Sequence, residues 1–256
     1  MIPAIFIASI LLIGALIPTT VTGQLLNQVL ADMVTGTDGD DNLEGSDNDD
    51  DIEGKGGNDK IDSKGGNDRN TGDKNEGDGD GGNDNIDSGD GDDRNVGDNS
   101  LGDGDGGDDV INSGDGNDFN RGDNEVGNGD GGDDVINSGA GDDTNFGDNQ
   151  IGDGDGGDDV INSGAGDDTN VGDNRFGSGD GGDDVINSGK GNDVNLGDNF
   201  EGNGAGGDDK INAAQGDDEL TGGGGADKFK CGSGVDTVTD FNEAEGDKAS
   251  GNCEIP

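Results

Sequence analysis

The chain has 256 residues and a formal net charge of −49, from 62 acidic and 13 basic side chains, with no histidine, tryptophan or tyrosine. Only 24% of the residues are hydrophobic, roughly half of what an ordinary globular domain contains. The lack of histidine removes the commonest general base, and the negative charge repels nucleic acid and anionic membranes. We therefore expect no conventional enzyme domain, no small-molecule substrate and no nucleic-acid partner. Such a composition predicts disorder unless another source of folding energy exists.

The first 23 residues differ from the rest of the chain. Residues 2–18 form an uncharged, mostly apolar run, and small residues follow as far as Gly23. This pattern predicts a cleaved signal peptide over residues 1–23. The alternative is a retained membrane anchor, although about 17 apolar residues lie at the lower limit for spanning a bilayer. Both interpretations predict an extracellular protein, secreted or associated with the cell surface.

Residues 24–35 carry Leu26, Val29, Leu30 and Met33 at helical spacing. We expect a short helical cap that covers the open edge of the first repeat. A helix that binds a partner is the alternative interpretation.

A 25-residue unit then dominates the sequence. Residues 129–153 and 154–178 are nearly identical, and the same unit recurs over 54–78, 79–103, 104–128 and 179–203. A degenerate copy begins at Gly204. Each unit divides into two nine-residue pieces and one seven-residue piece, as in GDGGDDVIN, SGAGDDTNV and GDNRFGS. Such periodicity predicts a solenoid, and we expect it to span residues 36–220.

The nine-residue pieces resemble the nonapeptide G-G-x-G-x-D-x-U-x of the RTX (hemolysin-type) calcium-binding repeat, from Gly36 to about Phe241. The resemblance implies an all-β fold, a calcium-stabilised parallel β-roll in which turns of successive coils hold multiple Ca²⁺ ions. The aspartate at the sixth position is then the candidate ligand: Asp41, Asp50, Asp59, Asp68, Asp84, Asp93, Asp109, Asp118, Asp134, Asp143, Asp159, Asp168, Asp184, Asp193, Asp209, Asp218 and Asp227.

The residue types agree with calcium as the ion. Glycine lets the backbone approach an ion closely, and carbonyl and carboxylate oxygens are the ligands that Ca²⁺ takes in sets of six to eight. With no histidine and two cysteines, zinc and copper lack their usual ligands. A merely solvated acidic tract is the alternative interpretation. The spacing of an EF-hand loop does not occur.

The U position predicts the core. In the first nonapeptide of each unit it holds isoleucine, which gives a ladder of Ile61, Ile86, Ile111, Ile136, Ile161, Ile186 and Ile211. In the second it holds asparagine: Asn70, Asn95, Asn120, Asn145, Asn170 and Asn195. Either a stacked asparagine ladder replaces the apolar column, or the strand shifts by one residue and turns Val96, Phe146, Val171 and Leu196 inward.

The seven-residue piece does not fit an 18-residue, two-sided coil. We therefore expect one coil per 25 residues, in which this piece forms a third side or a bulged corner. The sequence leaves open whether its aspartates bind ions or face solvent: Asp73, Asp98, Asp123, Asp148, Asp173 and Asp198.

Residues 221–256 have a more ordinary composition and form the predicted C-terminal cap. The run from Asp236 to Phe241 is similar to the strand that closes many RTX arrays. Cys231 and Cys253 are the only cysteines, and an even number in an exported protein predicts a disulfide between them. Two free thiols are the alternative.

We therefore expect an exported structural or adhesive protein that folds on binding extracellular Ca²⁺ and is not an enzyme, with a cell-surface or extracellular-matrix partner. One alternative is an ice-binding solenoid, although the column of Phe119, Thr144, Thr169 and Val194 is irregular. Another is an acidic calcium buffer or mineral-surface binder, which needs no fixed fold.

Overall fold

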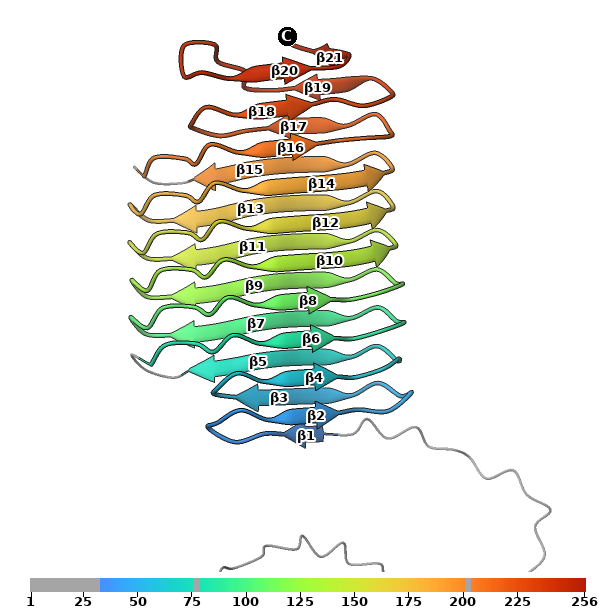
Figure 1. Ribbon diagram of the computed structural model, residues 1–256, viewed down its shortest axis with the longest axis vertical. Helices are drawn as coiled ribbons and strands as arrows, with labels where there is room; N and C mark the ends of the chain where they lie inside the picture. The colour runs from blue at the N-terminus through green and yellow to red at the C-terminus, as the bar shows by residue number, and fades with distance from the viewer. Residues whose placement is uncertain (1–32, 76–78, 201–203) are drawn as a thin grey trace, which may run out of the picture.

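A computed structural model describes residues 33–75, 79–200 and 204–256. The predicted signal peptide and residues 24–32 of the predicted cap lie outside these residues. The described chain winds into a flattened parallel β-solenoid with one sheet on each broad face (Figure 1). Each coil adds one strand to each sheet, so every neighbour in a sheet is two strands away in the chain. The all-β, parallel solenoid expected from the repeat is therefore confirmed.

The odd-numbered strands form an 11-stranded sheet. They are β1 (Met33–Thr35), β3 (Asp51–Lys55), β5 (Arg69–Asn75), β7 (Arg94–Leu101), β9 (Phe119–Val126), β11 (Thr144–Ile151), β13 (Thr169–Phe176), β15 (Val194–Phe200), β17 (Glu219–Thr221), β19 (Asp236–Val238) and β21 (Cys253–Glu254). The even-numbered strands form a 10-stranded sheet. They are β2 (Asn42–Glu44), β4 (Lys60–Asp62), β6 (Asn85–Asp87), β8 (Val110–Asn112), β10 (Val135–Ala140), β12 (Val160–Ala165), β14 (Val185–Lys190), β16 (Lys210–Asn212), β18 (Lys228–Lys230) and β20 (Lys248–Ser250).

The length of a coil changes along the axis. In the repeats, Ile136 pairs with Ile161, so one coil takes 25 residues as predicted. At the N-terminal end Met33 pairs with Asp51, and near the C-terminal end Lys210 pairs with Lys228, which leaves 18 residues per coil. The array is consequently wide in the middle and narrow at both ends (Figure 1).

The additional seven residues form neither the third side nor the bulged corner that the sequence predicts. They lengthen the odd strand, so that β11 continues to Ile151 whereas β17 has three residues. The chain then returns alongside this extension through residues 152–158, toward β12 (Figure 1). We call the strand extension and its returning segment the arm. Successive arms stack in register, since Asp148 pairs with Asp173 and Gly131 N–H donates to the Asp155 carbonyl at 2.8 Å.

The core between the sheets is narrow. On the even sheet the predicted isoleucine ladder is confirmed, and every member from Ile61 to Ile211 is completely buried. Leu43 continues this column at the N-terminal end, and Phe229 and Ala249 continue it at the C-terminal end. Each coil therefore contributes about one large apolar side chain from this sheet.

The odd sheet faces this ladder with asparagine. Asn145 is completely buried, donates to Asn170 Oδ1 at 2.9 Å and accepts from Asn120 Nδ2 at the same distance. The stacked asparagine ladder is thus the correct alternative, and the one-residue shift is wrong. Val96, Phe146, Val171 and Leu196 follow the inward asparagines and lie on the opposite face of the sheet, because side chains alternate along a strand. In the 18-residue coils Ile52 and Leu220 replace asparagine in the column.

The two ends of the array differ from each other. The helical cap predicted for residues 24–35 is not supported: its described part, Met33–Thr35, is strand β1, in which Val34 pairs with Ile52. A strand forms here because a short isolated helix is only marginally stable, whereas pairing with β3 ties this segment into the sheet. At the other end Cys231 and Cys253 form the predicted disulfide, with Cα atoms 5.3 Å apart. Nowhere in the described residues is there a helix with the length and hydrophobicity needed to cross a membrane.

Candidate metal-binding columns

The predicted ligand aspartates stack into two columns, one at each edge of the solenoid. Turns from even to odd strands carry the short-turn column: Asp50, Asp68, Asp93, Asp118, Asp143, Asp168, Asp193, Asp218 and Asp236. Connections from odd to even strands, which include the arms, carry the arm-side column: Asp41, Asp59, Asp84, Asp109, Asp134, Asp159, Asp184, Asp209, Asp227 and Asp247. All seventeen sequence candidates lie in one of these columns.

The short turn shows why the repeat needs glycine. Gly139 and Gly141 have φ angles of 98° and 137°, in the left-handed region that favours residues without a side chain. A Cβ on Gly139 would also meet the carbonyl oxygen of Gly114 in the coil beneath. Glycine therefore allows successive turns to stack directly on one another.

Each column aspartate uses its two oxygens differently. Asp143 Oδ1 accepts the backbone N–H of Asp118 at 2.8 Å, and Asp159 Oδ1 accepts that of Asp134 at the same distance. In these two residues Oδ2 is buried and has no hydrogen-bond partner. One oxygen thus fixes the carboxylate in the stack, while the other is available to coordinate a cation.

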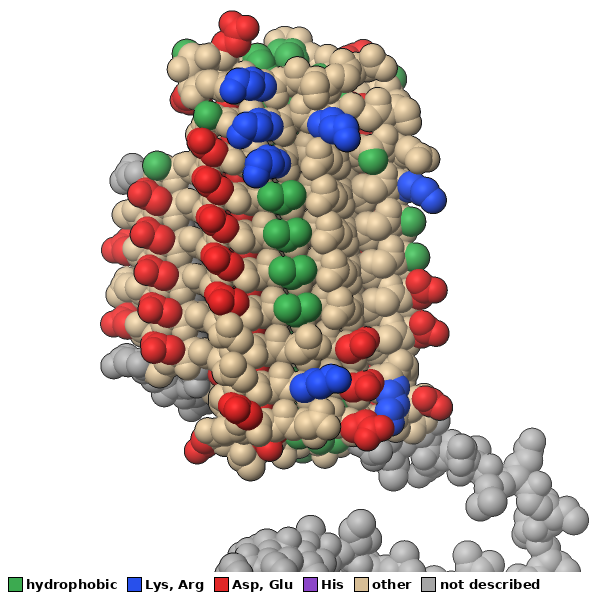
Figure 2. Space-filling model, in the orientation of Figure 1, with side chains coloured by type: hydrophobic (Ala, Val, Ile, Leu, Met, Phe, Trp, Pro, Cys, Tyr) green, Lys and Arg blue, Asp and Glu red, His purple; other side chains and the backbone are tan. Residues whose placement is uncertain are grey.

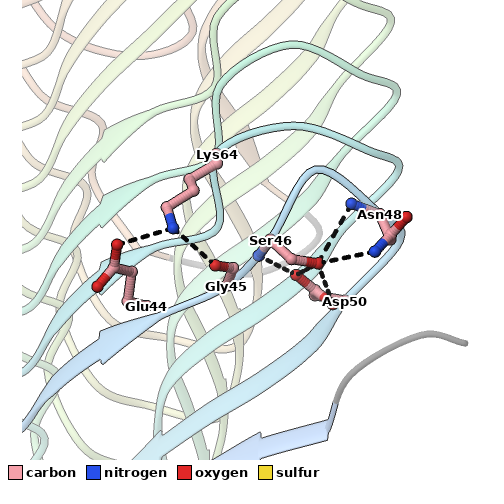
Figure 3. A network of polar contacts seen from close by, with 6 residues as sticks. All are labelled: Glu44, Gly45, Ser46, Asn48, Asp50 and Lys64. Atoms are coloured by element: carbon pink, nitrogen blue, oxygen red, sulfur yellow. Dashed lines mark hydrogen bonds and ion pairs between the residues drawn. The ribbon is translucent and has the colours of Figure 1, made fainter.

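The first turn of each column is arranged differently. Asp50 Oδ2 accepts the Ser46 N–H at 2.6 Å, beside the ion pair of Lys64 with Glu44 (Figure 3). Asp41 Oδ2 accepts the Thr37 hydroxyl at 2.9 Å. Asp41 and Asp50 are sequence candidates, yet their second oxygens close their own turns.

A third column lies inside the arms. It consists of the aspartates whose role the sequence leaves open: Asp73, Asp98, Asp123, Asp148, Asp173 and Asp198, all buried. Asp123 Oδ2 accepts the Gly132 N–H of the returning segment at 2.7 Å. Asp123 Oδ1 has no hydrogen-bond partner. The arm column therefore lies between the two segments of the arm and does not face solvent.

The arm column and the arm-side column meet. In five groups of three aspartates, one carboxylate oxygen from each residue lies within 4.8 Å of the others, and such a group can hold a metal ion. The groups are Asp59–Asp73–Asp84, Asp98–Asp109–Asp123, Asp123–Asp134–Asp148, Asp148–Asp159–Asp173 and Asp173–Asp184–Asp198.

Glycines make the space for these groups. A Cβ on Gly122 would meet Asp134 Oδ2, and one on Gly106 would meet Asp123 Oδ2. Any larger residue at these two positions would displace a carboxylate of the group. The glycines of the seven-residue piece and of the returning segment are therefore part of the site as well as of the turn.

Without a counter-ion, the buried carboxylates on the arm side strongly disfavour one another's ionised form. Burial, with the charges of the neighbouring Asp73 and Asp98 carboxylates, raises the pKa of Asp84 to about 9. Burial, with the charges of Asp98 and Asp84, holds the pKa of Asp109 well above its usual range. In the short-turn column the effect is smaller, because burial raises the pKa of Asp143 to about 7.

Two members of the columns are not predicted by the sequence. Asp236 Oδ1 accepts the Asp218 N–H at 3.2 Å, and Asp247 Oδ1 accepts the Asp227 N–H at 3.0 Å. Residues 231–239 fit the nonapeptide from the second position onward, but Cys231 occupies the first. Around Asp247 the glycine spacing is lost, so no local signal marks it.

The outer faces carry regular rows of side chains. On the even sheet Val110, Val135, Val160 and Val185 stack in one row, which continues as Lys210, Lys228 and Lys248 (Figure 2). Acidic rows flank this valine and lysine row on the side of the arms (Figure 2). On the odd sheet Thr144 stacks between Phe119 and Thr169, so the threonine row is as irregular as its sequence indicates.

Comparison with known families finds one whose model matches segments that contain these turns. The model of the RTX calcium-binding nonapeptide repeat (4 copies) matches residues 35–69, 103–119, 153–169, 178–194 and 203–238. None of the six arm-column aspartates falls within a matched segment. No curated protein matches the chain. The stacked turns, the buried aspartates and the matched segments together show that the chain belongs to the RTX calcium-binding nonapeptide-repeat family.

Proposed function

We propose that this chain is an exported structural or adhesive protein whose array folds when extracellular Ca²⁺ fills its aspartate columns. One observation carries the proposal. The Oδ2 atoms of Asp118, Asp143 and Asp168, in consecutive coils, are buried without a hydrogen-bond partner. Burying an ionised carboxylate without compensation is strongly unfavourable, so a cation at these positions supplies what the protein does not.

The donor set fits calcium best. Only oxygen donors converge in the columns, which favours a hard cation over zinc or copper. Glycines bring backbone carbonyls close to the carboxylates, as at Gly172 in β13, where a Cβ would meet Asp184 Oδ2 and, at 2.7 Å, the Gly197 carbonyl. Ca²⁺ accepts many oxygens in a flexible geometry, whereas Mg²⁺ requires a small octahedron and keeps its waters.

Ion binding must also supply much of the folding energy. The core has about one isoleucine per coil on one sheet and asparagine on the other, which is little apolar burial for a chain with a net charge of −49. When a metal site exists only in the folded state, the free energy of ion binding becomes free energy of folding. The calcium-free chain is therefore expected to be unfolded at neutral pH.

Export and adhesion are supported by separate features. The apolar residues 1–23 have the pattern of a signal peptide, and the Cys231–Cys253 disulfide suits an oxidising compartment. Extracellular modules bind calcium at roughly 10⁻⁴–10⁻³ M, a concentration that the cytosol does not reach. The long, regular outer rows provide a repetitive surface for a cell-surface or matrix partner.

Far-ultraviolet circular dichroism tests calcium-dependent folding. The chelated protein at pH 7.5 should give a coil-like spectrum, and about 10 mM CaCl₂, above the range of extracellular modules, should restore a β spectrum. An equal concentration of MgCl₂, at the same ionic strength, serves as the control for charge screening. A spectrum that stays coil-like in calcium, or that is equally folded in chelator, contradicts the proposal.

Adhesion needs its own measurement. The folded, fluorescently labelled protein should bind to the surface of cells or matrix in calcium, and chelation should release it. Unchanged surface binding by the chelated, unfolded chain contradicts a role for the folded array.

A further inference from the structure

We propose that the arms hold a row of four divalent-cation sites of their own, each formed by two successive arm aspartates and the arm-side aspartate between them. A fifth site, at the N-terminal end, is formed by one arm aspartate, Asp73, with the arm-side Asp59 and Asp84. The ion class is calcium. This inference rests on the proposed function for the identity of the ion but adds ligands that the nonapeptide motif does not contain. The arm aspartates belong to the seven-residue piece, outside every segment that the family model matches.

The groups repeat along the axis and share members. Asp123 belongs to the group with Asp98 and Asp109 and also to the group with Asp134 and Asp148. Each arm aspartate in the middle of the array therefore lies between two consecutive sites. From Asp98 to Asp198 the row is continuous, with one site for each step from coil to coil.

In the first two groups of the continuous row, four carboxylate oxygens lack protein partners. Asp98 Oδ1, Asp109 Oδ2, Asp123 Oδ1 and Asp134 Oδ2 have no hydrogen-bond partner, and their side chains are at most 1% exposed. In each residue the other oxygen accepts a backbone N–H at 2.7 Å, for example that of Gly107 for Asp98. The hydrogen bonds thus fix each carboxylate so that its second oxygen points into the shared space.

Charge identifies the ion as divalent. Each middle unit contributes one arm aspartate and one arm-side aspartate, such as Asp123 and Asp109, and therefore two negative charges for every site in the row. One divalent cation per site neutralises the row. A monovalent cation leaves half of the charge buried and uncompensated, which is strongly unfavourable.

The short-turn column has half this charge density. It contributes one aspartate per coil, such as Asp143, and none of the five groups of three contains a short-turn member. More carboxylates per site give a tighter calcium site. The arm row should therefore fill at a lower calcium concentration than the short-turn column.

The test replaces the arm column by asparagine in the full-length mature protein. The six arm aspartates, Asp73, Asp98, Asp123, Asp148, Asp173 and Asp198, are changed together. Asparagine keeps an oxygen for the Gly132 N–H, and its amide can donate to the Asp134 carboxylate, so the arm can remain folded without its ions. The matched control changes exposed aspartates of the returning segments, namely Asp108, Asp133, Asp158, Asp183 and Asp208, to asparagine. Asn83 already occupies this position in another unit.

Bound calcium per chain is measured by equilibrium dialysis and mass spectrometry, with circular dichroism on the same samples. The arm variant should lose about five ions, one for each group, and should retain the later, weaker phase of binding. The control should bind as many ions as the parent. The single variant Asp123→Asn should lose one or two ions.

Equal stoichiometry in the arm variant and the parent overturns the inference, because it shows that the arm aspartates hold no ions. In that case the parent still folds with calcium, so the proposed function stands. If the parent itself binds no calcium, both proposals fail.

Discussion

Asn145 donates its side-chain amide to Asn170 Oδ1 and to Ser138 Oγ, both at 2.9 Å, in the interior of the solenoid. The same pair of bonds recurs one coil earlier, where Asn120 donates to Asn145 and Ser113. The asparagine column is therefore a continuous hydrogen-bonded ladder that runs along the axis. It fixes the register of the coils, because a shift by one residue would remove the amides from every partner at once.

We expect Asn145→Leu to destabilise the array even though leucine has the same branching at Cγ. The change leaves Asn170 Oδ1 without its donor and removes the acceptor of Asn120, and each unsatisfied buried group costs about 1–3 kcal/mol. Thermal melts in saturating calcium measure the effect. Thr144→Ala, on the opposite face of the same strand, is the control and should have a small effect. Equal melting temperatures for Asn145→Leu and the parent would show that the ladder contributes nothing.

We expect Asp143→Ala to weaken calcium binding locally without unfolding the chain. The change removes one carboxylate from the short-turn column and leaves the Asp118 N–H without its acceptor, at a cost of about 1–3 kcal/mol. Because solenoid stability is close to a sum of repeat and interface terms, adjacent coils keep their own ions. Calcium titration and melts should show lower affinity and a lower melting temperature. Complete unfolding in saturating calcium would mean that the repeats are not independent.

The calcium-free chain should gain structure on acidification. The folded-state pKa values of Asp84 and Asp98, about 9 and about 7, lie above the value of 3.8 for an unperturbed aspartate. A raised pKa means that the folded state binds the proton more tightly, so this contribution to stability is complete below about pH 4 and is lost as the pH rises toward 9.

Circular dichroism in chelator should therefore show more β structure at pH 5 than at pH 8. With calcium present the direction reverses, because protons compete with the ions for the carboxylates, and the calcium affinity should fall at pH 5. Light scattering at both pH values controls for aggregation of the less charged chain. A chelated spectrum that does not change with pH contradicts the prediction.

Removal of the disulfide should loosen the C-terminal end alone. Cys231 and Cys253 close a loop with a sequence separation of 22, which on the chain-entropy estimate stabilises the end by about 3 kcal/mol. In the double variant Cys231→Ser, Cys253→Ser, amide hydrogen exchange should accelerate in β18–β21 and remain slow in β9–β14. Uniform acceleration over the whole array would show instead that the end controls global stability.

Much of the fold follows from the sequence because residues at the same position of successive repeats stack on one another. The recurrence of isoleucine every 25 residues is sufficient to predict that Ile136 lies beside Ile161, and the glycine–aspartate spacing is sufficient to place Asp143 in a stacked turn. Met33–Thr35 was predicted incorrectly because helical spacing over a few residues competes with a sheet edge that only the folded array provides.

The arm column could not be predicted from local pattern. Asp123 is followed by polar residues in the sequence, and its burial comes from a returning segment that folds over it and donates the Gly132 N–H. The sequence shows that seven residues must be accommodated, but their fold depends on the stacking of one arm against the next.

Because coils of equal length pair position by position, the fold also limits which insertions and deletions the gene can tolerate. Removal of residues 129–153 would bring the neighbouring coils together with each strand, turn and arm opposite its counterpart, because units of the same length pair position by position. An insertion or deletion of a single residue within a unit would misalign the arm and both columns at that coil. Unequal recombination between whole units is thus the tolerated route to longer or shorter variants, and we expect natural length differences to come in multiples of 25 residues.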